Sequence, residues 1–454
     1  MTHENCQPTF DRDLVARHAR ALPRYTSYPT ANHFNAGVDE TRLRGWLKLL
    51  SREKPVSAYV HVPFCEDLCW YCGCSTKATR RYAPVSAYVG ALEAELATLA
   101  GAIGFAPRLK HLHFGGGSPD ILAPDDIARL KIALENTFSF DPGLEFAVEI
   151  DPRLMNEAKA DAFVRAGVTR VSLGVQDFDE AVQAAIGRRQ SFAATRGALE
   201  AFRARGVASV NLDLVYGLPR QTKASLAATL QAALSLSPDR LALFGYAHLP
   251  QRIANQRLID ETTLPGAQER FEQARLAEQI LAGAGYVQLG VDHFAKPGDK
   301  IAQNPLSRNF QGYTDDPCDT LIGVGASAIS RLPQGYAQNA VPVGVHAALV
   351  EAGTLAVQRG FILAREDEMR GFVIERLMCD FAFPGRALAE RYGALAEPLE
   401  EEARAALAAD DDGFLEATPD GFRLRDWARP FARQVASRFD AYLGAGGARH
   451  SLAV

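Results

Sequence analysis

Short apolar runs alternate with longer amphipathic segments from residue 55 to about residue 330, and this alternation limits the folds open to the chain. The intervening segments, such as 86–100 and 191–206, repeat apolar residues at three- and four-residue steps, as helices packed on a sheet do. Strands separated by such helices form β-α units and a parallel sheet. The runs that we expect to be strands are 56–62, 109–114, 145–150, 170–175, 209–217 and 240–246, with 287–294 as a further strand.

Six β-α units favour an α/β fold built as a partial (β/α)6 TIM-like barrel over a small doubly wound sheet. Periodicity alone does not decide whether the sheet closes. We assign residues 55–362 to this barrel. A polar arm, residues 1–54, precedes it, and its segment PRYTSYPT is too polar and too irregular to predict a core element. We expect the arm to cover the active site and residues 1–30 to be dispensable for folding.

The pattern changes after about residue 363. Residues 366–381 have the spacing of an amphipathic helix, 413–424 that of a hairpin, and 427–443 that of a closing helix. The sequence therefore predicts a mainly helical C-terminal domain over 363–454 with a winged hairpin. Winged domains often bind DNA, but the acidic runs EPLEEEA and ADDDG argue against that use here. A lid or packing domain is the favoured interpretation.

Charge and hydropathy narrow the class of protein. The chain has 49 Lys and Arg against 54 Asp and Glu, a net charge of −5, so no basic excess indicates a nucleic-acid partner. Hydrophobic residues make up 47%, as in ordinary globular proteins. The N-terminus has no apolar run typical of a signal peptide, and charged, proline and glycine residues interrupt the apolar stretch 340–357. We expect a soluble, cytoplasmic, monomeric protein without a membrane span.

Four of the seven cysteines fall within the ten residues CEDLCWYCGC. In a reducing compartment such a cluster favours thiolates around a metal over disulfides. Four cysteines so close together do not easily wrap one tetrahedral zinc, whereas Cys65, Cys69 and Cys72 can hold three corners of an iron–sulfur cluster and leave one iron open. Cys74 is then a neighbour and not a ligand. Buried, unreactive thiols are the interpretation for the other three, Cys6, Cys318 and Cys379.

The clustered cysteines Cys65, Cys69 and Cys72, with Tyr71 directly before the third, resemble the motif of the radical S-adenosylmethionine (SAM) superfamily. GGGSP (115–119) is similar to that superfamily's glycine-rich methionine-binding turn. Further segments resemble the family of oxygen-independent coproporphyrinogen III oxidases along nearly the whole chain, less so after about residue 380. They include PRYTSYPT, YVHVPFC, VEIDPR, LGVQDF, NLDLVYGLPRQT, YAHLP, DHF, RNFQGY and GASAIS. Ser118 departs from the usual threonine but keeps the hydroxyl.

The resemblance implies a [4Fe-4S] cluster on Cys65, Cys69 and Cys72 and two molecules of SAM. Around the cluster-bound SAM it implies Tyr59, Gly116, Glu149 and Ile329. Around the second SAM it implies Tyr71, Gly117, Ser118, Gln176, Arg188, Asp213 and Ala247. Residue chemistry fits: a carboxylate in an apolar run, such as Asp213, is costly to bury unless hydrogen-bonded, and ribose hydroxyls are suitable donors. Structural salt bridges inside the barrel mouth remain the alternative for the charged members, and core packing for the tyrosines.

The implied activity is oxidative decarboxylation of two propionates of coproporphyrinogen III to vinyl groups, giving protoporphyrinogen IX in haem biosynthesis, by means of a 5′-deoxyadenosyl radical. An unidentified electron donor and acceptor are implied partners. Arg24 and Arg308 are candidates for binding the anionic substrate. One alternative is a haem chaperone of the same superfamily that binds haem without this turnover, although Cys74 and PRYTSYPT favour the oxidase. Another is a zinc-containing nucleic-acid module.

Overall fold

The computed structural model describes residues 12–444. In this part of the chain the main sheet has twelve strands, in the order β16-β15-β14-β13-β1-β4-β5-β6-β7-β8-β10-β9. Because this order has two ends, the sheet is a partial barrel that does not close. Six strands follow one another in the chain and run parallel: β1 (Val56–Val62), β4 (Arg108–Gly116), β5 (Ser139–Ile150), β6 (Arg170–Gln176), β7 (Ser209–Tyr216) and β8 (Arg240–Gly245).

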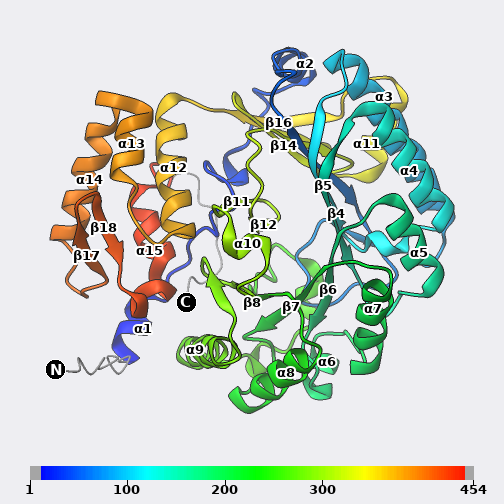
Figure 1. The fold of residues 1–454 in the computed structure, drawn as a ribbon. Coiled ribbons are helices and arrows are strands. Elements are labelled where there is room, and N and C mark those ends of the chain that lie inside the picture. The colour runs from blue at the N-terminus through cyan, green and yellow to red at the C-terminus, as the bar shows by residue number, and fades with distance from the viewer. Residues whose placement is uncertain (1–11, 445–454) are drawn as a thin grey trace.

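Helices cover the outer side of the curved sheet (Figure 1). Their starts follow from local chemistry, because the side chains of Asn156, Ser191 and Thr222 accept hydrogen bonds from backbone N–H groups that have no partner inside the helix. Their apolar faces pack on the strands into the main core, in which Phe114, Phe146 and others are fully buried. The predicted α/β fold is confirmed. The helices are α3 (Ala83–Ile103), α4 (Pro124–Thr137), α5 (Glu157–Ala166), α6 (Glu180–Ala185), α7 (Phe192–Ala204), α8 (Lys223–Ser235) and α9 (Ala267–Gly283).

The end of the sheet beyond β8 differs from the prediction of one strand over 287–294. Two short antiparallel strands, β9 (Val287–Leu289) and β10 (His293–Ala295), form there instead. Gly290 lies between them with a φ of +54°, a left-handed conformation that turns the chain and that glycine adopts at little cost. The turn places Asp292 and His293 beside the middle of β8. Short elements follow: α10 (Lys300–Gln303), β11 (Ser307–Asn309) and β12 (Gly312–Thr314).

At the opposite end, a strand next to β1 extends the parallel set and three antiparallel strands follow it. These are β13 (Leu321–Val324), β14 (Ile329–Leu332), β15 (Gly335–Asn339) and β16 (Val357–Ile362). The stretch 340–357 holds α11 (Val343–Glu351), which packs against α3. Within residues 12–444 no helix is long and apolar enough to cross a membrane.

The C-terminal elements gather beside the barrel in Figure 1, around a hydrophobic cluster of their own. The predicted helix and hairpin appear as α12 (Arg365–Cys379) and as β17 (Leu415–Thr418) with β18 (Gly421–Leu424), and α13 (Gly385–Tyr392) and α14 (Glu397–Ala408) lie between them. The prediction of one closing helix over 427–443 is wrong. Pro430, which has no N–H to donate, lies in a segment broken into η6 (Asp426–Phe431), α15 (Ala432–Ala436) and η7 (Ser437–Phe439).

The N-terminal arm packs against these C-terminal elements. It holds α1 (Arg12–His18), η1 (Ala31–His33) and α2 (Glu40–Leu47). Tyr25 and Tyr28 of PRYTSYPT are only 3% and 6% exposed and belong to the C-terminal hydrophobic cluster. The Tyr25 hydroxyl donates to Asp440 at 3.0 Å, and the Ala441 N–H donates to the Tyr28 hydroxyl at 3.0 Å. The expectation that this segment is too polar to form part of a core is therefore wrong.

Candidate active site

The cysteine loop begins where the first strand ends. Beyond β1, the short strands β2 (Phe64–Cys65) and β3 (Lys77–Ala78) pair and close the base of the loop between them. Cys69 is buried, Cys65 and Cys72 are half-buried, and Cys74 is exposed. All four line a cavity of about 480 Å³ at the carboxyl ends of the parallel strands. Partial and complete α/β barrels place their active sites at this end of the sheet.

A polar pair far along the chain holds the loop in shape. On η3 (Ala254–Leu258), the Asn255 side-chain amide donates to the carbonyl oxygens of Cys69, Trp70 and Cys72 at 2.9, 3.2 and 2.9 Å. Gln256 donates to the Tyr71 carbonyl at 2.8 Å. Loop carbonyls that would otherwise be unpaired are thereby satisfied. Sequence reasoning missed both residues, since nothing in ANQ indicates a contact more than 180 positions away.

The thiols themselves suit an iron–sulfur cluster. Cys65, Cys69 and Cys72 line one cavity, and soft thiolates are the ligands that such clusters prefer. Within residues 12–444 no three His, Cys, Asp or Glu side chains converge as tightly as one metal ion requires. Hydrogen bonding from Cys74 lowers the pKa of the Cys72 thiol, and the Cys74 N–H lies 3.4 Å from its sulfur. A lower pKa favours the thiolate form, which is the form that binds metal.

The two cysteines outside this loop that the structure describes take no part in the cavity. Cys379 is buried in α12 and Cys318 is half-buried before β13. Burial raises the pKa of Cys318 to about 12, so its thiol stays protonated at neutral pH. Cys6 lies outside the described residues.

Close packing requires glycine at two positions of the turn at the end of β4. Gly116 has a φ of +109°, and a Cβ there would lie 2.4 Å from the His61 ring. A Cβ on Gly117 would lie 2.5 Å from the Phe64 carbonyl oxygen. The turn therefore lies against the end of β1 and the start of β2, and any larger residue would push the cysteine loop away. The Ser118 hydroxyl, which is buried, donates to Asp120 at 2.8 Å.

Two carboxylates on parallel strands face the cavity, Glu149 near the end of β5 and Asp213 inside β7. Glu149 accepts hydrogen bonds from His113 at 3.1 Å and from the Gly116 N–H at 3.2 Å. Burial acts to raise the pKa of Glu149, but these hydrogen bonds and the nearby histidines outweigh it and hold the pKa below its ordinary value. Asp213 accepts from Ser172 and Asn211, both at 2.7 Å, yet burial raises its pKa. The two carboxyl groups therefore differ in the direction of their pKa shifts, which is downward for Glu149 and upward for Asp213.

Arg188 connects the cavity wall to the cysteine loop. Its guanidinium lies 3.2 Å from both carboxylate oxygens of Asp151 and donates to the Gly174 carbonyl at 2.6 Å. One of its nitrogens lies 3.4 Å from the Cys69 sulfur. Hydrogen bonds to a cluster-ligating sulfur adjust the electronic properties of a bound metal. Its Nε, by contrast, is buried without a partner in the described structure.

Nine of the eleven residues expected around SAM line this one cavity, namely Tyr71, Gly116, Gly117, Ser118, Glu149, Gln176, Arg188, Asp213 and Ala247. Tyr59 and Ile329 are outside the lining. The Tyr59 hydroxyl lies 3.1 Å from His61 Nδ1, and its ring stacks on His113, the partner of Glu149. Ile329 begins β14 and is half-buried against Gly323. Arg24 of the arm reaches the cavity and donates to the Gly245 carbonyl at 2.7 Å.

The chain is similar to known proteins of nearly equal length. A family model described as "Radical SAM superfamily" matches residues 59–233. A protein of Bradyrhizobium diazoefficiens named "Oxygen-independent coproporphyrinogen III oxidase" is 44% identical over 437 residues, which are 95% of this chain and 97% of that protein. "Coproporphyrinogen III oxidase, anaerobic 1" of Cereibacter sphaeroides is 44% identical over 432 residues, 93% of this chain and 94% of that protein. A solved structure of coproporphyrinogen III oxidase from Escherichia coli, described as a radical SAM enzyme, has a TM-score of 0.87 at 35% identity and covers 93% of this chain and all of its own.

Proposed function

Because the chain belongs to the family of oxygen-independent coproporphyrinogen III oxidases within the radical SAM superfamily, we propose that it converts coproporphyrinogen III to protoporphyrinogen IX by oxidative decarboxylation of two propionates. The protein is a radical SAM oxidoreductase of haem biosynthesis. One observation carries the proposal: Cys65, Cys69 and Cys72 lie in the same cavity as most of the residues expected around SAM. When bound, the [4Fe-4S] cluster and SAM supply the radical that removes hydrogen from an unactivated carbon.

The chain's own residues bind and orient these groups. Cys65, Cys69 and Cys72 would hold the cluster, and Cys74 would act beside them as a hydrogen-bond donor to Cys72. Asn255 would keep the loop carbonyls fixed, so that the three sulfurs face the cavity. We assign Tyr59, Gly116, Glu149 and Ile329 to the cluster-bound SAM. To a second SAM we assign Tyr71, Gly117, Ser118, Gln176, Arg188, Asp213 and Ala247.

Glu149 has the properties that binding of ribose hydroxyls requires. Its depressed pKa keeps it ionised at neutral pH, and its side chain is 39% exposed, towards the cavity. An ionised carboxylate accepts hydrogen bonds more strongly than a neutral group does. Arg188 also lies against Asp151, so besides contacting the second SAM it would orient this wall and donate to the Cys69 sulfur.

Anaerobic turnover tests the function. Protein reconstituted with iron and sulfide, then reduced, should convert coproporphyrinogen III to protoporphyrinogen IX with consumption of SAM, as measured by mass spectrometry of the products. The iron-free protein is the matched control and should form no product. Tight haem binding by the loaded protein without decarboxylation would identify a haem chaperone instead and would refute the proposal.

The cellular setting forms part of the same proposal. Clustered thiols that must stay reduced to bind iron are suited to the cytoplasm, where disulfides are rare. We place the enzyme there as a monomer that takes electrons from an external donor and passes the remaining electron to an external acceptor. Gel filtration of the reconstituted protein should give a mass near 49.3 kDa. A mass of twice that value would show a dimer.

A further inference from the structure

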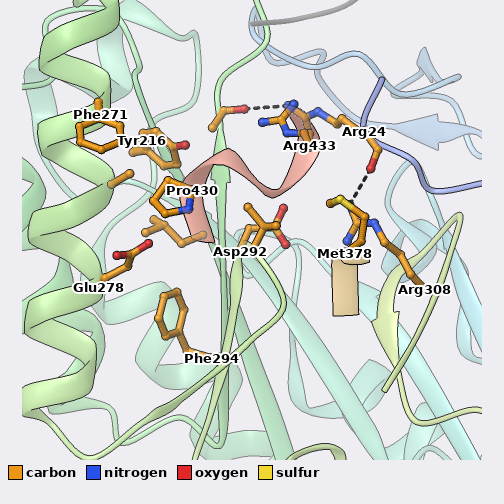
Figure 2. A pocket seen from close by; sticks show the side chains of 14 residues that line it. Arg24, Tyr216, Phe271, Glu278, Asp292, Phe294, Arg308, Met378, Pro430 and Arg433 are labelled. Carbon is orange, nitrogen blue, oxygen red and sulfur yellow. Dashed lines mark hydrogen bonds between the residues drawn. The ribbon is translucent and has the colours of Figure 1, made fainter. Parts of the chain in front are cut away.

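A second, smaller cavity lies where the arm, the barrel and the C-terminal elements meet. Its volume is about 50 Å³, and Figure 2 shows its lining side chains, with Asp292 near the middle of the view. Arg24 and Gly245 line this cavity and the large cofactor cavity as well, so the two are neighbours. On the accessible-volume measure a single water needs about 10–15 Å³, so there is room here for a small group.

Positive charge dominates the polar part of the lining. Arg24 comes from the arm, Arg308 from β11 and Arg433 from α15. Two carboxylates also line the cavity. Glu278 pairs with Arg275 on its own helix, and the Asp292 carboxylate is hydrogen-bonded to His293 Nδ1 at 2.8 Å. The three arginines therefore outnumber the carboxylates available to them.

Several guanidinium N–H groups have no partner among the described residues. Arg308 is 8% exposed, and its Nε and Nη1 are buried without a hydrogen bond, as is Nη1 of Arg433. Only Nη2 of Arg308 is used, since it donates to the Arg24 carbonyl at 3.2 Å, and the ring of Tyr313 supports this guanidinium from one side at 4.3 Å. A buried donor without an acceptor is costly, so these groups indicate a ligand that accepts hydrogen bonds.

The electrostatics of the cavity agree with this interpretation. Burial lowers the pKa of Arg433 to about 10, and the charges of Arg24 and Arg308 add to that effect. Burial acts in the opposite direction on Asp292, but the hydrogen bond from His293 and the charges of Arg308 and Arg24 outweigh it and lower its pKa. An anion entering the cavity would offset the mutual repulsion of the arginines.

The rest of the lining is apolar. Phe271, Phe294, Met378, Leu243 and Val291 surround the charged groups. A ligand that suits both parts carries a short hydrocarbon stem and a terminal carboxylate. A propionate has this form.

We propose that this cavity binds a non-reacting propionate of the tetrapyrrole, with its carboxylate on Arg308 and Arg433 and its methylenes against the phenylalanines. Arg24 lines both cavities and would therefore contact the substrate where it passes from one cavity into the other. The proposal rests on the proposed function and specifies how that site recognises its substrate. Anchoring one propionate would orient another towards the cofactor cavity, which lowers the entropic cost of reaching the reactive geometry.

The test compares an acid with its ester. Reconstituted protein would be titrated with coproporphyrin III and, in the same detergent, with its tetramethyl ester, and the binding constants measured by fluorescence. The wild type should bind the acid more tightly. In Arg433→Gln and in Arg308→Gln the acid-to-ester affinity ratio should fall about tenfold, because a charge-assisted hydrogen bond is lost for the acid alone. Arg433→Lys should retain part of the preference, since it keeps the charge without the planar fork.

The control is Arg429→Gln. Arg429 lies four residues before Arg433, but it pairs with Asp426 and does not line the cavity. It should leave the ratio unchanged. An unchanged ratio in Arg433→Gln, with unaltered melting temperature and iron content, would overturn the proposal even if Arg308→Gln fails to fold. Failure of the proposed function can be told apart from failure of this binding site. If the proposed function is wrong, the wild type decarboxylates no coproporphyrinogen, whatever its preference between acid and ester.

Discussion

The two cavities differ in how the chain builds them. The cofactor cavity is formed mostly by residues near or just beyond the carboxyl ends of the parallel strands, as the cysteines follow β1, Gly116 ends β4 and Glu149 is the last but one residue of β5. The arginine cavity takes Arg24, Asp292, Arg308 and Arg433 from four segments that have no regular spacing in the sequence. A site at strand ends is positioned by the sheet itself, whereas a site at a junction depends on every element that packs there. Damage to the two regions should therefore have different effects.

The largest expected effect belongs to the cofactor cavity. Cys69→Ser should abolish cluster binding and all turnover, because an iron–sulfur cluster needs each thiolate ligand. Cys74→Ser should still assemble about four irons per chain, since Cys74 only donates to Cys72. Iron and sulfide analysis after anaerobic reconstitution measures both.

Cys318→Ser is the matched control, since its half-buried thiol lies outside the cavity. It should keep full iron content. If Cys74→Ser loses as much iron as Cys69→Ser, then the assignment of ligands is wrong.

The second-largest effect should be that of the N-terminal arm on the free energy of unfolding. Tyr25→Ala removes a ring that is 3% exposed and packed in the C-terminal cluster, so it should lower the free energy of unfolding by roughly 3–5 kcal/mol. Tyr25→Phe keeps the ring and loses the bond to Asp440, so it should cost about 1 kcal/mol. Denaturant titration measures both. Because Tyr25 and Tyr28 are buried in this cluster, deleting residues 1–30 should destabilise the C-terminal elements, contrary to the expectation from the sequence that these residues are dispensable for folding. A truncated protein of wild-type stability would show that the buried tyrosines contribute nothing.

Asn255 should have a smaller effect, confined to the cysteine loop. Asn255→Asp keeps the shape of the side chain but removes the amide that donates to three loop carbonyls. We expect a loss of roughly 2–3 kcal/mol in the ordering of the loop, measured as faster release of iron to a chelator. Asn304→Asp is the control and should release iron at the wild-type rate, because Asn304 donates to Asp315 and does not line the cavity. Equal rates in both variants would mean that the loop holds its shape without Asn255.

Particular residues show what the sequence can predict. The bounds of β1 match the predicted run 56–62, because its aliphatic residues stand at every second position, as in a strand, and are buried in the main core. The single strand over 287–294 was a wrong prediction because one glycine, Gly290, turns the chain inside an otherwise apolar run. Tyr25, Asn255 and Arg433 could not be identified, since a polar or irregular segment does not reveal what it packs against, and their contacts span much of the chain.

The smallest effect is a pH dependence in the sheet. Burial acts to raise the pKa of Glu145, but Arg170, 2.8 Å away, and Arg240 outweigh it and lower the pKa to about 2, from the ordinary 4.5. Because the folded-state pKa lies below the unfolded one, the stabilisation is complete above about pH 4.5 and is lost as the pH falls towards about 2. Glu145→Gln should therefore lose roughly 1–2 kcal/mol at pH 7 and almost nothing near pH 2. The loss is smaller than the roughly 3 kcal/mol that the full pKa shift corresponds to, because both side chains are 17% exposed and water screens the pair. Urea unfolding between pH 2 and pH 7 measures this loss, and the surface variant Glu135→Gln is the control. An equal loss at both ends of the pH range would show that packing, and not the charge of Glu145, supports the sheet.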